Sequence, residues 1–299
     1  MIPEFPEFKP LDVGDKPQLD TLFARLNPLA SDYTFTNLFG WRHAWHYRVA
    51  RFGGGVLVLR ENKGVPSFLQ PLVPDGHTAA ARACLDYLCA HTATPVIERA
   101  GEDFTAAPSF DASAFTLAED RDNFDYVYPV PVLRELKGPD YHNKKNLLNQ
   151  FRKKTAHRYL PLTSALVTEA IRFQHEWCEA RECFRDEGLE HEQTAIIEML
   201  GLFGAGGLFG GVIEVDGRIV AVTLGERLNA DTLVIHVEKG RGDLTGIYQA
   251  INHAFLEAEG APFNFVNREQ DLGVEGLRKA KLSYNPVRMV KKYRITPRG

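Results

Sequence analysis

The sequence predicts a mixed α/β fold that contains two copies of one α/β unit. One observation is a hairpin: two apolar runs between residues 211 and 224 flank Asp216-Gly217, a dipeptide that tolerates the positive φ angles of a tight turn. A second is the following segment, where a strand at 232–237 leads through a glycine-rich loop into a helix at 247–259. A third is a shorter version of the same element order before residue 139.

The individual elements follow from local patterns. Apolar residues at three- and four-residue spacing indicate helices, alternating apolar and polar residues indicate strands, and proline or glycine clusters separate them. In the first half these patterns predict helices at 16–30 and 78–92, strands at 48–51, 56–61, 67–71, 95–99 and 125–131, and irregular chain at 104–122. In the second half they predict helices at 141–159, 163–187, 190–203, 247–259 and 274–281 and strands at 211–215, 218–224, 232–237, 264–267 and 288–295.

Length and composition favour two domains. The chain has 299 residues, of which 44% are hydrophobic and 25% charged, as in an ordinary globular protein. Gly138-Pro139 marks the boundary, so we expect an N-terminal domain over 1–138, a basic connecting helix over 139–160 and a C-terminal domain over 161–299. There is no run of about 18 apolar residues that could span a membrane, and the acidic, proline-rich start is unlike a signal peptide. We expect a cytoplasmic protein.

The four cysteines predict free thiols. They form two pairs, Cys84 with Cys89 and Cys178 with Cys183, and each pair is five residues apart within a helical pattern. That spacing puts the two sulfurs on different helix faces and matches no common zinc motif. We therefore expect neither a disulfide nor a metal site.

Basic residues are concentrated in two segments, although the formal net charge is −4. Between residues 137 and 158 seven Lys and Arg face one acid, and after residue 275 there are eight basic residues and no acid. A local positive surface can attract a polyanion even on an acidic protein. The alternative is an ordinary solvated face. The candidates on the helix at 141–159 are Lys144, Lys145, Arg152 and Lys153.

The glycine-rich loop before the helix at 247–259 is a candidate anion site. Loop amides and the unpaired N–H groups of a first helical turn favour a phosphate. The alternative is that Asp243 caps the helix and the glycines only make the turn. The candidate phosphate-binding residues are Arg241, Gly242, Thr245 and Gly246.

Acyl transfer needs a base, an acid and donors aimed at the developing oxyanion. His236 and Glu238 alternate on the strand before the loop, so they should share one face, and either could act as the base. Tyr248, in the first turn of the following helix, is a candidate acid.

Two further pairs are cleft candidates. Asn267 and Arg268 leave the end of a strand, where polar residues commonly line α/β sites, although a solvated loop is the alternative. Trp41 and Arg42 lie in the aromatic-rich segment at 31–47 and could line a cleft or belong to the core.

Several segments together resemble a known family. They are HNKKNLLNQFRKK, VDGRIVAVTLGERL, HVEKGRGDLTGIYQAINHAF and FVNREQDLGVEGLRKAKLSYNPVRMVKKY, and they look like the C-terminal domain of bacterial phosphatidylglycerol lysyltransferases and its cytoplasmic relatives. The resemblance implies two tandem acetyltransferase-like (GNAT) domains with mixed central sheets, and transfer of an aminoacyl group from aminoacyl-tRNA to a lipid hydroxyl. It also implies Tyr284 as a catalytic acid. The GNAT pyrophosphate signature is present only in weakened form, at residues 241–246.

Three functional hypotheses follow. The first is a GNAT-like acyltransferase, using aminoacyl-tRNA as donor and a small-molecule, lipid or peptide acceptor, with its site between the two domains. The second is a CoA-dependent N-acetyltransferase, for which acetyl-CoA or another acyl-CoA would be the donor. The third is a non-catalytic tandem domain that binds tRNA or another polyanion.

Overall fold

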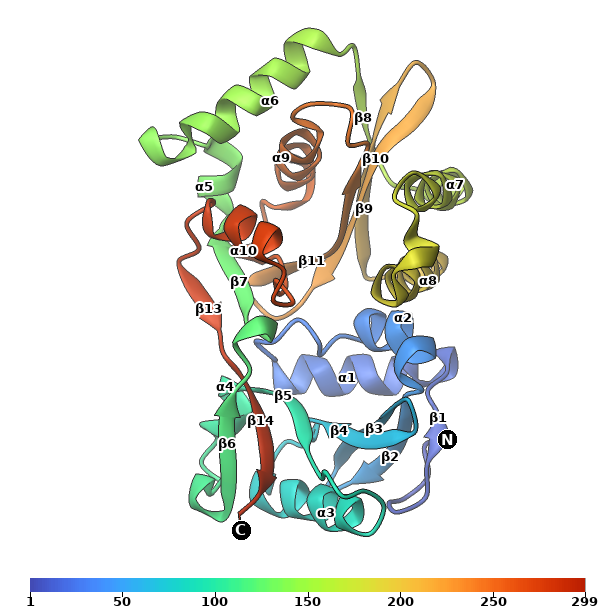
Figure 1. Cartoon of the computed structure of the whole chain (residues 1–299), viewed down its shortest axis with the longest axis vertical. Coiled ribbons are helices and arrows are strands. Elements are labelled where there is room, and N and C mark those ends of the chain that lie inside the picture. Colours follow the sequence, from blue (N-terminus) through green and yellow to red (C-terminus); the bar gives the residue numbers. More distant parts are fainter. Residues whose placement is uncertain (299) are drawn as a thin grey trace. The chain divides into compact units, whose positions relative to one another are not determined.

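A computed structural model describes residues 1–298, which divide into two compact units (Figure 1). The first unit holds residues 1–125 and the chain from Val290 onward, and the second holds residues 126–289. These boundaries differ from those expected from the sequence, because the end of the chain returns to the first unit. No helix among residues 1–298 is long and apolar enough to cross a bilayer.

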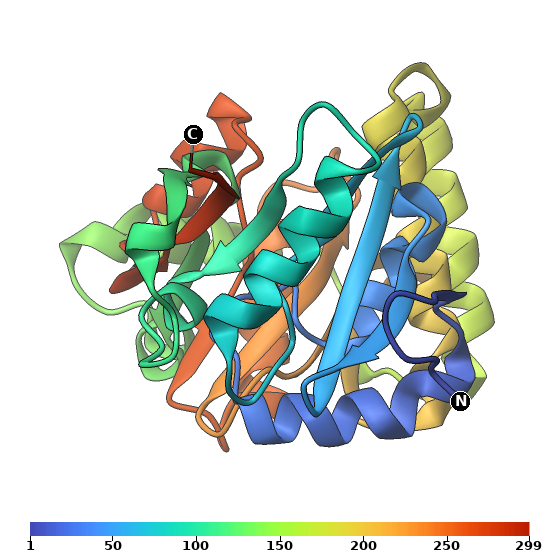
Figure 2. The ribbon, with the colours of Figure 1, turned by 90° about the horizontal axis from the view of Figure 1, so that it is seen from below.

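The sheet of the first unit has seven strands in the order β1-β2-β3-β4-β5-β14-β6. The strand β14 pairs antiparallel with both β5 and β6, so a strand from the end of the chain is built into the sheet of the first unit. The helix α3 (His77–Cys89) lies against one face of this sheet (Figure 2), and its buried apolar residues share a core with residues of β3 to β5. The other elements are α1 (Lys16–Leu26), α2 (Phe35–Trp45), α4 (Glu102–Thr105), β1 (Lys9–Pro10), β2 (Arg48–Phe52), β3 (Gly55–Asn62), β4 (Val65–Leu69), β5 (Ile97–Gly101), β6 (Phe115–Glu119) and β14 (Lys292–Pro297).

A buried ionic cluster holds β14 in this unit. Nζ of Lys292, on β14, lies 2.6 Å from Oδ1 of Asp125 and 2.5 Å from Oδ2 of Asp32. Asp125 also accepts hydrogen bonds from the backbone N–H and the hydroxyl of Ser31, and Arg99 pairs with Asp32. Burial favours a neutral Lys292, but the two carboxylates outweigh it and raise the pKa of the ammonium. The side chains of the cluster are therefore charged and largely shielded from solvent.

The sheet of the second unit has the order β13-β7-β12-β11-β10-β9-β8. The helices α7 and α8 lie on one side of it and α9 on the other (Figure 1). Apolar residues of α9, including Ile247, Ile251 and Phe255, form the core with Leu233 and Ile235 of β11. The elements are β7 (Asp125–Pro129), α5 (Val130–Glu135), α6 (His142–Lys154), β8 (Arg158–Pro161), α7 (Ser164–Ala180), α8 (Glu187–Gly201), β9 (Leu208–Val215), β10 (Arg218–Arg227), β11 (Thr232–Gly240), α9 (Ile247–Glu259), β12 (Phe265–Asn267), α10 (Glu275–Leu282) and β13 (Arg288–Val290).

Some elements differ from the sequence-based expectations. The helix expected at 141–159 ends at Lys154, and the strand β8 follows it. The irregular acidic segment contains the strand β6, and the aromatic segment contains α2. The final strand is divided at Lys291, so that β13 joins the second sheet and β14 the first. The strands β6, β8, β13 and β14 form because each pairs with a strand that is distant in the sequence. Local sequence patterns do not carry that information.

The prediction of four free thiols is wrong for one pair. Cys178 and Cys183 form a disulfide with Cα atoms 5.2 Å apart, whereas Cys84 and Cys89 are free. The five-residue spacing does not lie within one helix, because α7 ends at Ala180 and Glu182 turns the chain with a φ of 52°. This reversal brings Cys183 back to the end of α7.

Reduction of this disulfide should lower the free energy of unfolding by about 2 kcal/mol, because the cross-link lowers the chain entropy of the unfolded state. The loss is at the small end of the usual range, since the closed loop is short. Urea unfolding with and without dithiothreitol measures the effect. A variant with Cys178→Ser and Cys183→Ser serves as the control and should not respond to the reductant. Equal stability of the oxidised and fully reduced wild-type protein would contradict this expectation.

Candidate active site

The candidate site begins where two parallel strands of the second unit separate. The strands β11 and β12 pair only from Thr232 with Phe265 to Val234 with Asn267. Beyond that point β11 continues to Gly240, whereas β12 ends and the chain turns away. Polar side chains of β11 and of the turn after β12 meet in this region. This is the sheet edge at which the sequence predicted a polar site.

A β-bulge at His236 changes the direction of the side chains on β11. On the other side of β11, Leu224 of β10 pairs with Val237 and the next residue, Gly225, pairs with Ile235. His236 is therefore the extra residue of the bulge, and a bulge of this kind re-aims the residues beside it. The expected alternation of His236 and Glu238 on one face is interrupted, and the two side chains bind different partners.

Glu238 is the centre of one polar cluster. Nη2 of Arg268 donates to Oε1 of Glu238 at 2.7 Å, and Nδ2 of Asn252, on α9, donates to Oε2 at 2.8 Å. The Glu238 side chain is 12% exposed and that of Arg268 15%. Charge-assisted hydrogen bonds at these distances, with little solvent around them, are strong and directional. The carboxylate and the guanidinium therefore have fixed orientations.

Tyr284 joins this cluster through Arg268. The guanidinium lies 4.9 Å from the centre of the Tyr284 ring, and Nε2 of Gln249, on α9, donates to the phenol oxygen at 3.3 Å. Burial raises the pKa of Tyr284, although the neighbouring Arg268 opposes the shift. Nη1 of Arg268 is buried and has no hydrogen-bond partner among residues 1–298. The cluster thus combines a protonated phenol with a buried cationic donor.

Lys144 of α6 completes the cluster. Its Nζ donates to Oγ of Ser283 at 2.6 Å and lies 4.4 Å from the centre of the Tyr284 ring. Burial and the charge of Arg268 lower the pKa of Lys144. The structure therefore separates Lys144 from the other basic candidates of this helix. Those remain on the exposed side of α6: Lys145, Arg152 and Lys153.

His236 forms a second cluster with two carboxylates. Nδ1 lies 2.7 Å from Oε1 of Glu269, and Nε2 lies 2.9 Å from Oε1 of Glu226. Burial alone would lower the pKa of His236, but the hydrogen bonds and charges of the two glutamates raise it to about 10. At neutral pH the ring carries a proton on both nitrogens. In that state it is a cation and has no lone pair with which to act as a base.

The contacts of the glycine-rich loop favour the alternative to an anion cradle, in which the loop only makes a turn. Arg241 makes two hydrogen bonds to Asp243, at 3.1 and 2.6 Å, and both side chains are more than half exposed. The amides of Arg241, Leu244 and Ile247 donate to carbonyls of Val220, Arg241 and Leu244. The charge of Arg241 is thus balanced by its neighbour, and these three amides already have carbonyl partners.

Gly246, rather than Asp243, precedes the first residue of α9. It has a φ of 87°, and a Cβ on this residue would come within 2.2 Å of the carbonyl oxygen of Leu147 on α6. Tyr248 donates to the carbonyl of Gly240 at 3.2 Å, and Nε1 of Trp177 donates to the same oxygen at 3.1 Å. Tyr248 therefore supports the start of the loop in this structure. Gly242 and Thr245 lie on the loop between these contacts.

The first unit has a corresponding pair of parallel strands, but the space beside it is filled. The strands β4 and β5 pair only at Phe68 with Ile97 and Leu69 with Glu98. Beyond them the amide of Gly101 donates to the side chain of Gln70 at 2.8 Å, and the hydroxyl of Tyr33 donates to the carbonyl of Arg99 at 2.7 Å. Both side chains are buried. The neutral side chains of Gln70 and Tyr33 therefore occupy the space beside this strand pair.

The two cleft candidates of the first unit lie on α2. Arg42 folds back on its own helix, where it donates to the carbonyl of Phe39 at 2.6 Å and lies over the Phe39 ring. Trp41 is half-buried beside it. A cleft role for Trp41 and Arg42 stays a prediction.

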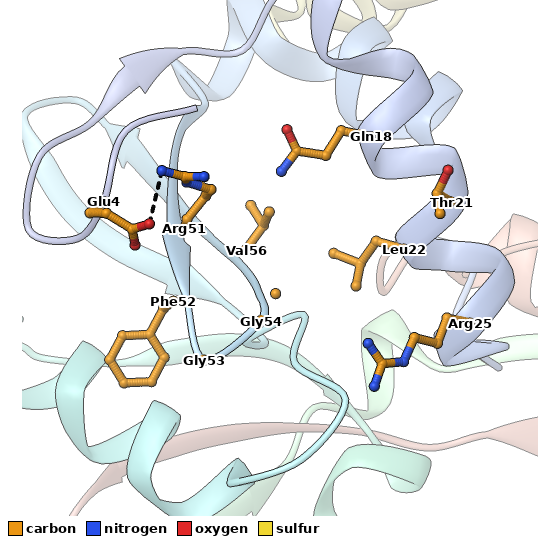
Figure 3. Close-up of a pocket in the computed structure, with 11 residues that line it drawn as sticks. Glu4, Gln18, Thr21, Leu22, Arg25, Arg51, Phe52, Gly53, Gly54 and Val56 are labelled. Atoms are coloured by element: carbon orange, nitrogen blue, oxygen red, sulfur yellow. Dashed lines mark ion pairs between the residues drawn. The ribbon is translucent and has the colours of Figure 1, made fainter. Parts of the chain in front are cut away.

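A hollow of about 340 Å³ lies elsewhere in the first unit, between α1 and the hairpin of β2 and β3 (Figure 3). Arg51 pairs with Glu4 at 2.9 Å on one side of it, and Gln18 and Arg25 of α1 face it from the other. None of the residues predicted to be functional lines this hollow.

The structure brings together four residues that the sequence predicts as site candidates, whereas their partners were not predicted: Glu238, Arg268, Tyr284 and Lys144. Gln249 and Asn252 were missed, although their three-residue spacing on a strongly amphipathic helix marks two polar side chains on the same side as the core. The glutamates around His236 were missed because they lie on other strands and turns.

Comparisons with known proteins agree with this architecture. The family model described as "Phosphatidylglycerol lysyltransferase, C-terminal" matches residues 23–296. No functionally curated protein matches the chain. A conserved protein of unknown function from Bacteroides thetaiotaomicron is similar over 100% of both chains, with 30% identity and a TM-score of 0.89.

Two more distant structures show the same fold. The C-terminal domain of a putative lysylphosphatidylglycerol synthetase from Agrobacterium fabrum has a TM-score of 0.66 at 12% identity, covering 96% of this chain and 92% of its own. L-PGS from Bacillus licheniformis has a TM-score of 0.65 at 12% identity, covering 99% and 94%. The fold is GNAT-like, with two mixed sheets. The chain belongs to the family of phosphatidylglycerol lysyltransferase C-terminal domains.

Proposed function

We propose that this protein is an acyltransferase whose site is the Glu238–Arg268–Tyr284 cluster of the second unit. The observation that carries the proposal is the buried arrangement of a carboxylate, a guanidinium with an unpartnered N–H and a protonated phenol beside two separating strands. Acyl transfer uses one group of each kind. Residues of β11, of α9 and of the turn after β12 all contribute to the site.

The three side chains have distinct roles in this proposal. Glu238 accepts the proton of the attacking hydroxyl or amine. Nη1 of Arg268 donates to the oxygen that becomes negative when the acyl carbon is attacked. Tyr284 gives its phenol proton to the leaving oxygen. A donor that is already oriented in a site with little water stabilises the transition state more than it would in water.

We propose aminoacyl-tRNA as the donor, with a small-molecule, lipid or peptide acceptor. The exposed basic side of α6 supports this choice, because it carries Lys145, Arg152 and Lys153 without an acid between them. The Arg241–Asp243 pair counts against acetyl-CoA, since the loop that would hold a pyrophosphate has its only arginine neutralised. The structural relatives named as lysylphosphatidylglycerol synthetases also support it.

Donor binding should separate the two transferase hypotheses. An aminoacyl minihelix with a non-hydrolysable amide linkage should raise the melting temperature, because a ligand at a hundred times its Kd stabilises the folded state by about 2.7 kcal/mol. Acetyl-CoA at the same concentration should have little effect. Differential scanning fluorimetry measures both. Stabilisation by acetyl-CoA but not by the minihelix would contradict the proposed donor and favour CoA-dependent acetylation.

A second candidate function is polyanion binding without catalysis, and the basic face of α6 favours it. Lys145→Glu with Lys153→Glu should weaken tRNA binding at least about tenfold and reduce the slope of log K against log salt by about 1.4 to 1.8, since each phosphate contact contributes about 0.7–0.9. Fluorescence anisotropy over a salt series measures the slope. Arg218→Glu, at the exposed β9–β10 turn, is the control. An unchanged slope in the double variant would remove α6 from the binding surface. Binding without any transfer from charged tRNA would favour the non-catalytic function.

A further inference from the structure

The turn after β12 is held in an unusual backbone conformation. Glu269 has a φ of 55°, a left-handed conformation that is uncommon for residues with a side chain. Such a residue persists only where its surroundings fix it. Its neighbour is Arg268, so the conformation of this turn decides where the guanidinium points.

The backbone of the turn is fixed on several sides. The amide of Glu269 donates to the side chain of Asn267 at 2.8 Å, and its carbonyl accepts from the amide of Tyr126 at 3.2 Å. Nζ of Lys281, on α10, donates to the carbonyls of both Arg268 and Glu269. Arg268 in turn donates its amide to the carbonyl of Tyr126 at 2.9 Å. These contacts bind the main chain, but they do not bind the Glu269 side chain.

His236 contacts the side chain of Glu269. Its side chain is fully buried, with Nδ1 on Glu269 and Nε2 on Glu226. Glu226 lies on β10, so the ring connects the turn to the strand on the far side of β11. Since His236 is also the bulged residue of β11, the same residue redirects Glu238 and anchors the turn that carries Arg268.

We propose that His236 is a positioning residue, which acts through Glu269 to hold the Arg268 guanidinium against Glu238. The effect of this positioning on catalysis rests on the proposed function, but the orientation of Arg268 can be tested without a substrate. The rival role is that of a general base, which the sequence also suggests. Both ring nitrogens are engaged with carboxylates, so a base role would require one of these contacts to break.

The direct test follows the guanidinium of Arg268 by ¹⁵N NMR, with the signal assigned from its loss in Arg268→Lys. In the wild-type protein a guanidinium held by Glu238 should give Nη signals that exchange slowly with water. His236→Gln should broaden or remove them, whereas His175→Gln, on the exposed side of α7, should leave them unchanged. Slowly exchanging Arg268 signals in a folded His236→Gln protein would overturn the proposal.

A second variant covers the case in which His236→Gln does not fold. Glu269→Gln keeps a hydrogen-bond acceptor beside the ring but removes the charge, and its side chain is 20% exposed. Glu269→Gln should also broaden the Arg268 signals, but less than His236→Gln does. Unchanged signals in folded Glu269→Gln would exclude the path through Glu269.

Transfer kinetics separate positioning from base catalysis. A positioning role predicts that His236→Gln lowers kcat about 10- to 100-fold with KM changed less than about twofold and with the pH profile of kcat unchanged in shape. Loss of an acidic limb of that profile would instead show a base and overturn the proposal. If no transfer occurs even in the wild-type protein, the proposed function fails, and the NMR result still decides whether His236 positions Arg268.

Discussion

Replacing Arg268 with alanine should reduce the rate of acyl transfer at least about 100-fold, the largest effect we expect from a single substitution. The guanidinium fixes Glu238 at 2.7 Å and supplies the buried Nη1 donor, so its removal takes away both the orientation of the base and the oxyanion contact. Single-turnover transfer from labelled aminoacyl-tRNA gives the rate of the chemical step. Arg268→Lys should be intermediate, because it keeps the charge but loses the planar fork.

Two controls separate this effect from loss of folding. Arg134→Ala breaks another arginine–glutamate pair of the second unit, with Glu257 at 3.0 Å on the surface, and should retain full activity. Arg268→Ala combined with Glu238→Gln leaves no unpaired buried charge, so it should be more stable than Arg268→Ala alone and equally inactive. Wild-type rates in Arg268→Ala would rule out this cluster as the active site.

Replacing Lys292 with methionine should destabilise the first unit by about 3–5 kcal/mol, because it removes the cation buried against the carboxylates of Asp125 and Asp32. Arg99 remains near Asp32, but at the longer distance of 3.2 Å. Asp125 and Asp32 lie 2.6 and 2.5 Å from the ammonium, and the Lys292 side chain is completely buried. Methionine keeps most of the apolar volume, so packing contributes little to the difference. Urea unfolding followed by far-ultraviolet circular dichroism measures the change.

The neighbouring lysine provides a matched control. Lys291 pairs with Glu119 at 2.6 Å, but both side chains are about half exposed. Water already solvates the two groups, so Lys291→Met should change the free energy of unfolding by less than about 1 kcal/mol. Similar losses in the two variants would show that burial of the cluster is not what stabilises β14.

Local signals in the sequence predict the parts of the fold that are formed by neighbouring residues. The hairpin at Asp216-Gly217 and the strand, loop and helix that follow it are present as expected, since turn chemistry and apolar spacing act over a few residues. The position of β14 could not be predicted in the same way. Its partners are β5 and β6, about 175 to 200 residues earlier by sequence number.

The same distinction applies to the site. Glu238 and Arg268 were each recognisable as polar residues at the ends of strands, but their contact spans 30 residues. It also depends on a bulge at His236, which appears only when β11 is aligned with β10. Arg241 as a phosphate anchor stays a prediction, and a local contact counts against it, because Asp243 pairs with the guanidinium. That carboxylate was visible in the sequence as an alternative to phosphate binding.

The place of β14 has a consequence for the order in which a nascent chain can fold. The strand β6 pairs only with β14 in this sheet, and β5 keeps one open edge until β14 arrives. Residues 1–125 leave the ribosome first, yet their sheet stays incomplete until residues 292–297 have followed the whole of the second unit. The strands of the second unit, apart from β13, are all synthesised before residue 268. Domains commonly fold in the order of synthesis. Here the second unit can complete its sheet first, while the first unit still has exposed strand edges.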